Sequence, residues 1–521
     1  LGTTSTLNAN GNLTIVSTFT STARVGEIPS SATITGNVNV QRYIPAKRAI
    51  RFLSSPVAGA TLADWKNNMS ISGLTGTAGG FDNTGFPTVT FYVESVTGST
   101  NVGWFRPTSI TQPLEVGRGY QAIVRGSRDA GSSSFVNVPT IETTLAVSGP
   151  LNQGTISLPV SYSNTVVTTN DGWNLVGNPY ASEIDWNSTT GWTKTNLTGA
   201  IYFYDPLTAY TNVTTGLGVF ISCVDAVCTG GRTNGFIIPS GQGFFVKATA
   251  AGANLQVNET AKVSLAGTNF KSNFRTEQTV GDYFNISLTA PNGLRDDAII
   301  RFHKTATQGF DSNLDALKFR NSSLNLFSYL GDNELAINSL PYAAGDSLTI
   351  PLVVENDTNL TYSFGFKKMA FSFAHTLILL DKKEQQAVAI DDNVMYQFTG
   401  SSRNRFYVIM KADSIKKIEK PVDELIATSI GDANTGKQWQ IAPNPTETGL
   451  LTIYASHIPA GELVSIVLFD MLGNVKMEDK VTIDPSHSHN LQIANTLSAG
   501  MYILQVKHKN DQYNTKLIYN K

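Results

Sequence analysis

Few side chains of this 521-residue chain have the types and spacing that catalysis or metal binding requires. The two cysteines, Cys223 and Cys228, have four residues between them. In an oxidising compartment this arrangement favours a local disulfide, whose short loop gives modest entropic stabilisation. Two alternatives are weaker. Two thiols without a neighbouring histidine make a poor zinc site, and the spacing differs from the Cys-x-x-Cys of redox-active pairs.

Adjacent acids occur at Asp296-Asp297 and at Asp391-Asp392. Paired carboxylates serve glycoside hydrolysis or bind calcium in extracellular loops. Neighbours on a strand point to opposite faces, however, so a sequential pair is not a catalytic pair. We expect both pairs to be solvated turn acids, with a structural calcium ion as the lesser alternative.

The chain has six histidines but no His-Glu-x-x-His motif. His487 and His489 would lie on one face of a strand and could share a metal ion, but they follow Asp484-Pro485-Ser486, which predicts a solvated turn. The chain also lacks a P-loop and a Gly-x-Ser-x-Gly nucleophile motif. We therefore predict that this chain is not an enzyme and holds no cofactor.

Aromatic side chains are the remaining candidates for ligand contact. Trp65, Trp173 and Trp186 recur within an internal repeat described below, which favours a role in the core. Trp104 and Tyr210 have no counterpart in the other copy and lie near predicted turns. If an aromatic residue contacts a ligand, we expect it to be one of these two.

Composition narrows the class of protein. Charged residues make up 15% of the chain and the net charge is −2, which argues against nucleic acid and against electrostatic docking on anionic lipid. The longest apolar run, 369–380, is too short to cross a membrane as a helix. The chain starts at Leu1 without a signal peptide. We therefore expect it to be part of a larger precursor whose signal peptide lies upstream.

The elements that would position these residues are strands, and many belong to a duplicated module. Pro56 and Pro179 follow matching strands and are 123 positions apart, while Gly119 and Gly243 precede another matching pair and are 124 apart. Insertions differ between the copies, as expected for surface loops on a common scaffold. The cysteines fall within the insertion of copy 2, which we expect to present a binding loop.

These patterns predict an all-β fold of several tandem β-sandwich-like modules. The expected segments are 1–41 as the end of an upstream β unit, 42–145 and 146–265 as the module copies, 270–411 as a β-sandwich, 412–439 as a linker, and 440–521 as a small β domain.

Segment 440–521 alternates short strand-like runs with Gly, Asn and Asp turns. Two prolines stiffen its entry, glycines mark tight turns, and lysines flank the last strand. The residues that carry this pattern are Pro443, Asn444, Pro445, Asp470, Gly473, Gly500, Tyr502, Lys516 and Lys521.

In the order and spacing of these motifs, segment 440–521 resembles the type A C-terminal sorting domain of proteins exported by the type IX secretion system of Bacteroidota. The resemblance implies a small Ig-like β-sandwich that is recognised by the outer-membrane translocon and its shuttle protein. It also implies secretion across the outer membrane, removal of the domain by a sortase-like protease, and attachment to lipopolysaccharide at the cell surface. The duplicated modules resemble, more loosely, modules of large surface proteins of the same bacteria.

Residues and resemblance together predict an exported cell-surface adhesin or gliding-associated structural protein, with a surface component or polysaccharide as its ligand and no nucleic-acid partner. The alternative is a stalk or accessory region of a secreted enzyme whose catalytic domain precedes residue 1.

Overall fold

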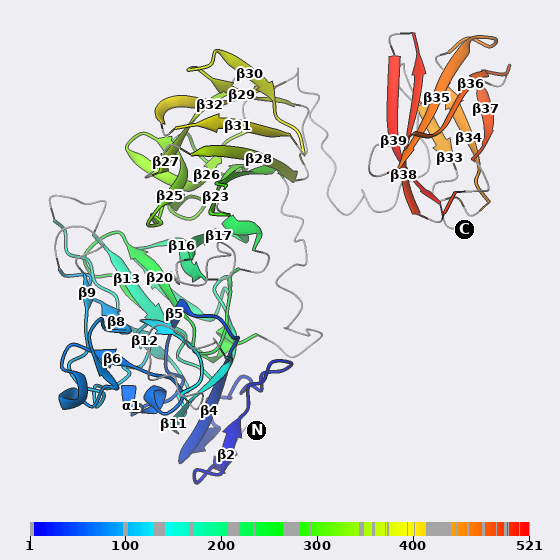
Figure 1. Ribbon diagram of the computed structural model, residues 1–521. Coiled ribbons are helices and arrows are strands. Elements are labelled where there is room, and N and C mark those ends of the chain that lie inside the picture. The colour runs from blue at the N-terminus through cyan, green and yellow to red at the C-terminus, as the bar shows by residue number, and fades with distance from the viewer. Residues whose placement is uncertain are drawn as a thin grey trace. The chain divides into compact units, whose positions relative to one another are not determined.

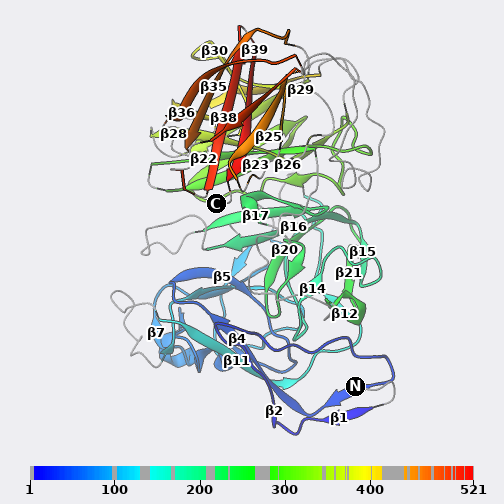
Figure 2. The same ribbon diagram turned by 90° about the vertical axis from the view of Figure 1, so that its right-hand side faces the viewer.

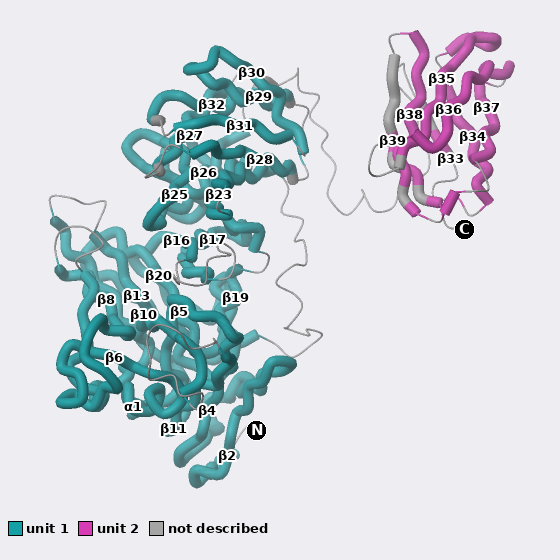
Figure 3. The backbone as a smooth tube through the Cα atoms, in the orientation of Figure 1, with its two compact units in different colours: residues 1–418 teal, residues 419–521 magenta. Residues whose placement is uncertain are grey.

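The computed structural model describes residues 5–519 apart from several internal segments. The segments left out are 97–102, 129–140, 166–170, 207–217, 233–234, 264–281, 292, 343–347, 357–359, 370, 372–374, 393, 401, 413–438, 443–445, 447, 456–457, 471–474, 486, 494–496, 499 and 510. The chain divides into two compact units, Leu1–Ile418 and Glu419–Lys521, which we call unit 1 and unit 2 (Figure 3). Both are built almost wholly from strands, which confirms the all-β prediction. Within the described residues, no helix is both long enough and apolar enough to span a membrane.

Two small sheets form the N-terminal part of unit 1. One pairs β1 (Thr6–Asn8) with β3 (Thr33–Thr35), and the other has the order β11-β4-β2. The second sheet contains β2 (Leu13–Ile15), β4 (Asn37–Ile44) and β11 (Thr143–Pro150). Strand β4 pairs with β11 along its whole length. The boundary that the sequence suggested at residue 145 thus lies inside β11, and residues 1–41 share a sheet with a strand that follows module copy 1.

The first copy, called module 1, is built on an antiparallel sheet with the order β5-β10-β8-β9 (Figure 1). These strands are β5 (Ala49–Leu53), β8 (Val89–Tyr92), β9 (Trp104–Phe105) and β10 (Tyr120–Val124). Helix α1 (Leu62–Lys66) starts after Thr61, whose backbone N–H donates to the Asp64 carboxylate at 2.7 Å, as in a capping box. Trp65 on this helix is buried against the edge of Tyr120. Short elements follow the helix: β6 (Ser72–Gly73), η1 (Gly76–Gly79) and β7 (Asn83–Thr84).

The second copy, called module 2, repeats this arrangement with the order β13-β20-β16-β17-β18. These strands are β13 (Trp173–Gly177), β16 (Leu197–Asp205), β17 (Val219–Val224), β18 (Val227–Cys228) and β20 (Gly243–Ala248). In each module the first strand pairs with the last, and the last pairs with the middle one. Smaller elements complete module 2: β12 (Ile156–Leu158), β14 (Ile184–Asp185), β15 (Trp192–Thr195), β19 (Ile237–Ile238), β21 (Asn254–Val257), η3 (Thr229–Gly231) and η4 (Glu259–Ala261).

The two modules contact each other through equivalent residues of the repeat. Leu53 of module 1 forms a β-bridge with Gln242 of module 2, and their counterparts Val176 and Arg118 form the reciprocal bridge. The backbone N–H of Ser54 donates to the Gly241 carbonyl at 2.9 Å, while that of Gly177 donates to the Gly117 carbonyl at 2.8 Å. The modules therefore meet about a local pseudo-twofold axis, as the subunits of a symmetric dimer do.

Residues 283–412 form what we call the large-sheet domain. Its described residues contain an eleven-stranded sheet with the order β30-β29-β32-β27-β25-β26-β23-β22-β28-β31, and β24 pairs with β26. The strands are β22 (Tyr283–Thr289), β23 (Arg295–Phe302), β24 (Ala316–Leu317), β25 (Leu324–Leu330), β26 (Asn333–Leu340), β27 (Leu348–Asn356), β28 (Thr361–Met369), β29 (His375–Asp381), β30 (Gln386–Ala389), β31 (Met395–Thr399) and β32 (Ser402–Ala412).

The sheet of this domain folds over on itself. Phe398 on β31 and Phe406 on β32 lie in opposite halves of the strand order, yet their ring centroids are 4.6 Å apart. Phe364 on β28 also reaches Phe406, at 5.0 Å. The prediction of two facing sheets is therefore corrected, because the two facing layers are halves of one hydrogen-bonded sheet.

Strands β16 and β17 lie between β20 and the large-sheet domain (Figures 1 and 2). Apolar side chains from module 1, module 2 and the large-sheet domain share one buried cluster there, including Phe52, Phe245 and Ile337. The three parts of unit 1 are thus joined by a common core.

Unit 2 contains two sheets, with the orders β33-β34-β37 and β36-β35-β38-β39. The strands are β33 (Trp439–Ala442), β34 (Leu450–Ala455), β35 (Leu463–Asp470), β36 (Val475–Thr482), β37 (Ser488–Gln492), β38 (Gly500–His508) and β39 (Asp511–Tyr519). Alternate residues of the strands, such as Leu451 and Ile453 of β34 and Val464 and Ile466 of β35, fill one buried cluster between the sheets. This is the small β-sandwich that the sequence predicted.

Candidate functional site

A cleft of about 490 Å³ lies in unit 1 where module 2 meets the large-sheet domain. Module 2 lines it with Tyr162, Trp173, Thr198 and Lys247, among others. Its volume is in the range of small-molecule sites, which usually combine apolar walls with a few placed polar groups.

Strand register explains how module 2 forms its wall. Trp173 begins β13 and lies directly opposite Lys247 on β20. The Lys247 ammonium lies 4.7 Å from the centre of the Trp173 ring and donates a 2.6 Å hydrogen bond to the Asp171 carbonyl. Burial lowers the pKa of Lys247 to about 8, although Asp171 and Glu94 oppose that shift.

The large-sheet domain lines the opposite wall with the segment 317–320, the β25–β26 hairpin tip and Phe310. Gly331 adopts a φ of +60° at that tip, a conformation that glycine reaches without steric cost. Asp332 and Asn333 follow it and face the cleft.

Lys318 belongs to this wall and forms a buried ion pair. Its ammonium lies 2.5 Å from Asp296 Oδ2, and the two side chains are 2% and 3% exposed. The backbone N–H of Leu326 donates to the same oxygen at 2.6 Å. Burial raises the pKa of Asp296, and the Lys318 ammonium and the Leu326 N–H oppose that rise.

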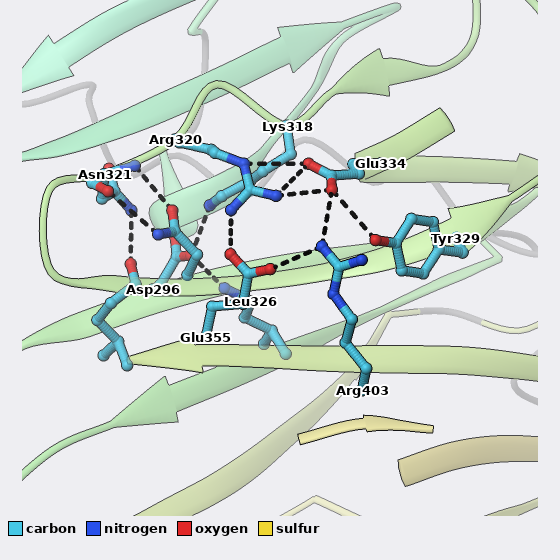
Figure 4. Close-up of polar contacts among 11 residues, drawn as sticks. Asp296, Lys318, Arg320, Asn321, Leu326, Tyr329, Glu334, Glu355 and Arg403 are labelled. Atoms are coloured by element: carbon cyan, nitrogen blue, oxygen red, sulfur yellow. Dashed lines mark hydrogen bonds and ion pairs between the residues drawn. The ribbon is translucent and has the colours of Figure 1, made fainter. Parts of the chain in front are cut away.

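Arg320 anchors a second, more exposed charge network (Figure 4). Its guanidinium donates to both oxygens of Glu334 at 2.6 and 2.7 Å and also to Glu355. Arg403 donates to Glu355 at 3.1 Å, and the Tyr329 hydroxyl donates to Glu334 at 3.2 Å. Burial lowers the pKa of Arg320, but these hydrogen bonds outweigh it and raise the pKa overall.

The aromatic rings of the cleft are of two kinds. Trp173 and Phe319 belong to the shared core, and their ring centroids are 4.7 Å apart. Tyr162 and Phe310 are only half-buried, and within the described residues neither ring contacts another aromatic ring. The cleft thus offers two free ring faces beside polar groups, which is an arrangement for binding.

The cysteines of module 2 form a disulfide, but not on an exposed loop. Cys223 and Cys228 face each other across the β17–β18 hairpin, whose turn residues Asp225 and Ala226 both have positive φ. The cysteines are 2% and 8% exposed. Asp225 pairs with the buried Arg301 of the large-sheet domain at 2.8 Å. The insertion therefore docks two parts of unit 1 together, and the expectation of a binding loop there is corrected.

The two aspartate pairs have different environments. Asp296 and Asp297 are buried on β23, so the expectation that they are solvated turn acids is wrong. Asp297 accepts from Arg295 at 3.0 Å, and Asp296 pairs with Lys318 as described above. Asp391 and Asp392 are exposed, as predicted.

The two histidines lie at the start of β37 in unit 2. His487 adopts a φ of +56° in the preceding turn, and its Nδ1 lies 2.8 Å from the Ile458 carbonyl oxygen. His489 pairs with Ile453 of β34. In the part of the chain that the structure describes, no three His, Cys, Asp or Glu side chains are grouped so as to hold a metal ion.

The tryptophans of the repeat are buried, which confirms their core role: Trp65, Trp173 and Trp186 are 2%, 4% and 2% exposed. Trp104 packs against Phe245 with centroids 5.9 Å apart and is part of the shared core, so it does not form an exposed platform. Tyr210 lies outside the described residues.

The sorting-signal residues are described only in part. Gly500 begins β38, and buried Tyr502 on that strand donates to the Ser498 carbonyl at 2.8 Å. Asp470 ends β35, and Lys516 lies on β39. Outside the described residues lie Pro443, Asn444, Pro445, Gly473 and Lys521, as does nearly all of the expected linker.

Sequence reasoning missed the cleft. One signal was present, because Lys318 and Arg320 alternate with Phe319 in an extended segment and so share one face. Their partners Asp296, Glu334 and Glu355 lie on three other strands, and no local motif identifies them.

Comparisons with known proteins address the family of this chain. Residues 3–410 match the family described as "Domain of unknown function (DUF8693)". Residues 440–520 match the family described as "Secretion system C-terminal sorting domain". Among curated proteins, none matches this chain.

One solved structure with some likeness to this chain is described as "Crystal structure of tetra-tandem repeat in extending region of large adhesion protein". The likeness covers 62% of this chain and 93% of that chain, with 10% identity and a TM-score of 0.12. A TM-score this low supports no conclusion about fold or function.

The sorting domain indicates a cargo of type IX secretion that is exported across the outer membrane. The first match covers most of the chain, so this protein belongs to the DUF8693 family and ends in a secretion system sorting domain.

Proposed function

We propose that this chain acts at the cell surface as a non-enzymatic binding protein, either an adhesin or a gliding-associated structural protein. The observation that carries the proposal is the sorting domain at 440–520 behind a large all-β body. Export through the type IX translocon would present that body to the outside.

The sorting domain also suggests the partners of export. They are the outer-membrane translocon with its shuttle protein, followed by a sortase-like protease that removes the domain and joins the body to lipopolysaccharide. A surface component or a polysaccharide is the proposed ligand of the body.

The cleft supports a binding role because its carboxylates are engaged in ion pairs. Asp296 is bound by Lys318, while Glu334 accepts from both Arg320 and Tyr329. A general acid or base needs a carboxyl group that is free to exchange its proton with a substrate. Carboxylates held by cations instead fix the shape of the wall.

The test is localisation of the native protein with and without residues 440–521. The full chain should be found on intact cells, whereas the truncated chain should be retained in the periplasm. Surface labelling followed by cell fractionation measures this difference. Cells that display the full chain should also adhere to a surface that cells lacking the protein do not.

The matched control is a body variant with an exposed substitution, Phe86→Ala, whose side chain is 71% exposed. It should be displayed like the wild type. Surface display of the truncated chain would contradict the export part of the proposal. Normal display without any gain in adhesion would contradict the binding part.

A further inference from the structure

We propose that the cleft between module 2 and the large-sheet domain binds a neutral saccharide. The inference rests on the proposed function and names the ligand class of the site. Its basis is the combination, at one place, of two free aromatic faces, unpaired hydroxyl and amide groups, and charges that are already neutralised.

The aromatic faces come from both sides of the cleft. Tyr162 belongs to module 2 and Phe310 to the large-sheet domain, and both are half-buried in the lining. A half-buried ring keeps one face open, and the apolar face of a pyranose packs on such a ring. Two rings on separate walls can hold one sugar between them or two consecutive sugars of a chain.

Polar groups near the rings suit hydroxyl groups. Asp332 and Asn333 at the β25–β26 hairpin tip supply a carboxylate and an amide, which together accept from and donate to neighbouring hydroxyls. Thr198 also lines the cleft, and its hydroxyl oxygen is buried without a hydrogen-bond partner among the described residues. An unpaired buried hydroxyl is unfavourable unless a ligand or a water molecule satisfies it.

The charges of the lining argue against a charged ligand. Lys318 is paired with Asp296, and Arg320 is paired with Glu334 and Glu355. A charged ligand would have to displace one of these internal partners and leave it buried and unpaired, which is costly. A neutral, hydroxyl-rich ligand leaves all of these pairs intact.

The experiment is binding of the full chain to neutral oligosaccharides, namely maltotriose, cellotriose, xylotriose, mannotriose and chitotriose. Isothermal titration calorimetry gives the affinity. At least one trisaccharide should bind, and Tyr162→Ala and Phe310→Ala should each weaken that binding about tenfold, since stacking and burial of one ring are both lost. Phe86→Ala is the matched control and should bind as the wild type does.

Salt dependence separates a neutral ligand from a charged one. Affinity for the bound trisaccharide should change less than about twofold between about 0.05 and 0.5 M NaCl, because no ion pair forms on binding. Failure of all five trisaccharides to bind overturns the proposal. So does binding that both ring substitutions leave unchanged while all variants keep the wild-type unfolding temperature.

Cells distinguish failure of this inference from failure of the proposed function. If the Tyr162→Ala, Phe310→Ala double variant is displayed and adheres as the wild type does, adhesion stands and the cleft is not its site. If the wild type binds a trisaccharide but is not displayed on cells, the saccharide site stands and the surface function fails.

Discussion

At the scale of single residues, the structure buries charges that the sequence does not mark. Lys318 and Asp296 exclude water from each other, and their ion pair is held by a further hydrogen bond from Leu326. Such pairs add little net stability compared with apolar residues, but loss of one partner leaves the other buried and unpaired. Their role here is to fix one wall of the cleft.

Asp315 should make the stability of unit 1 depend on pH. It is fully buried, accepts from Ser339 at 2.6 Å and Asp311 at 2.7 Å, and burial raises its pKa from 3.8 to about 6. The folded state therefore holds a proton that the unfolded chain releases between about pH 4 and 6, so this carboxyl contributes stability at the acidic end that is lost as pH rises through 6. Asp315→Asn should reduce the difference in unfolding free energy between about pH 4.5 and 7 by about 2 kcal/mol.

Urea unfolding followed by tryptophan emission at both pH values measures this effect. Asp391→Asn is the control, because that carboxylate is exposed and its pKa is lowered by hydrogen bonds from the Asp392 N–H and Lys368. An Asp315→Asn variant with the wild-type pH difference would show that this carboxyl does not titrate in the window.

At the scale of elements, the main finding is how the two modules meet. Each module's glycine-rich turn packs on the first strand of the other module, through the reciprocal bridges of Leu53 and Val176. The repeat was visible in the sequence because matching strands share residue patterns. Its pairing was not, because the contacts join residues distant in the chain without a local pattern.

Gly119 should tolerate no side chain at this interface. A Cβ there would lie 2.6 Å from the Val176 carbonyl oxygen and 2.7 Å from a Leu175 side-chain carbon. Gly119→Ala should therefore lower the unfolding free energy of unit 1 by about 1–3 kcal/mol through overpacking. Gly26→Ala is the matched control, because a Cβ at Gly26 meets no atom within 4 Å. Equal thermal stability of the two variants, measured by circular dichroism, would mean that the modules separate easily here.

At the scale of the whole molecule, the chain has two compact units with separate cores. Unit 2 is the smaller and buries less of its surface, so we expect it to be the less stable. The full chain should unfold in two thermal transitions. Deletion of residues 440–521 should remove the lower transition and leave the upper temperature unchanged, as measured by differential scanning calorimetry. A single transition in the full chain, shifted by the deletion, would indicate that the units stabilise each other.

The sequence by itself determined the strand content, the sorting domain and the burial of Trp65, Trp173 and Trp186. These follow from local signals, namely period-two alternation, turn residues and repeated motifs, which are read within short windows. Only the tertiary structure decided that the large sheet folds over on itself, that the disulfide hairpin is buried beside Arg301, and that Asp296 pairs with Lys318. It also decided the cleft, whose lining comes from two parts of the chain. The physical reason is that strand pairing and burial of charge depend on partners distant in sequence, and period-two alternation is the same whichever strand becomes the neighbour.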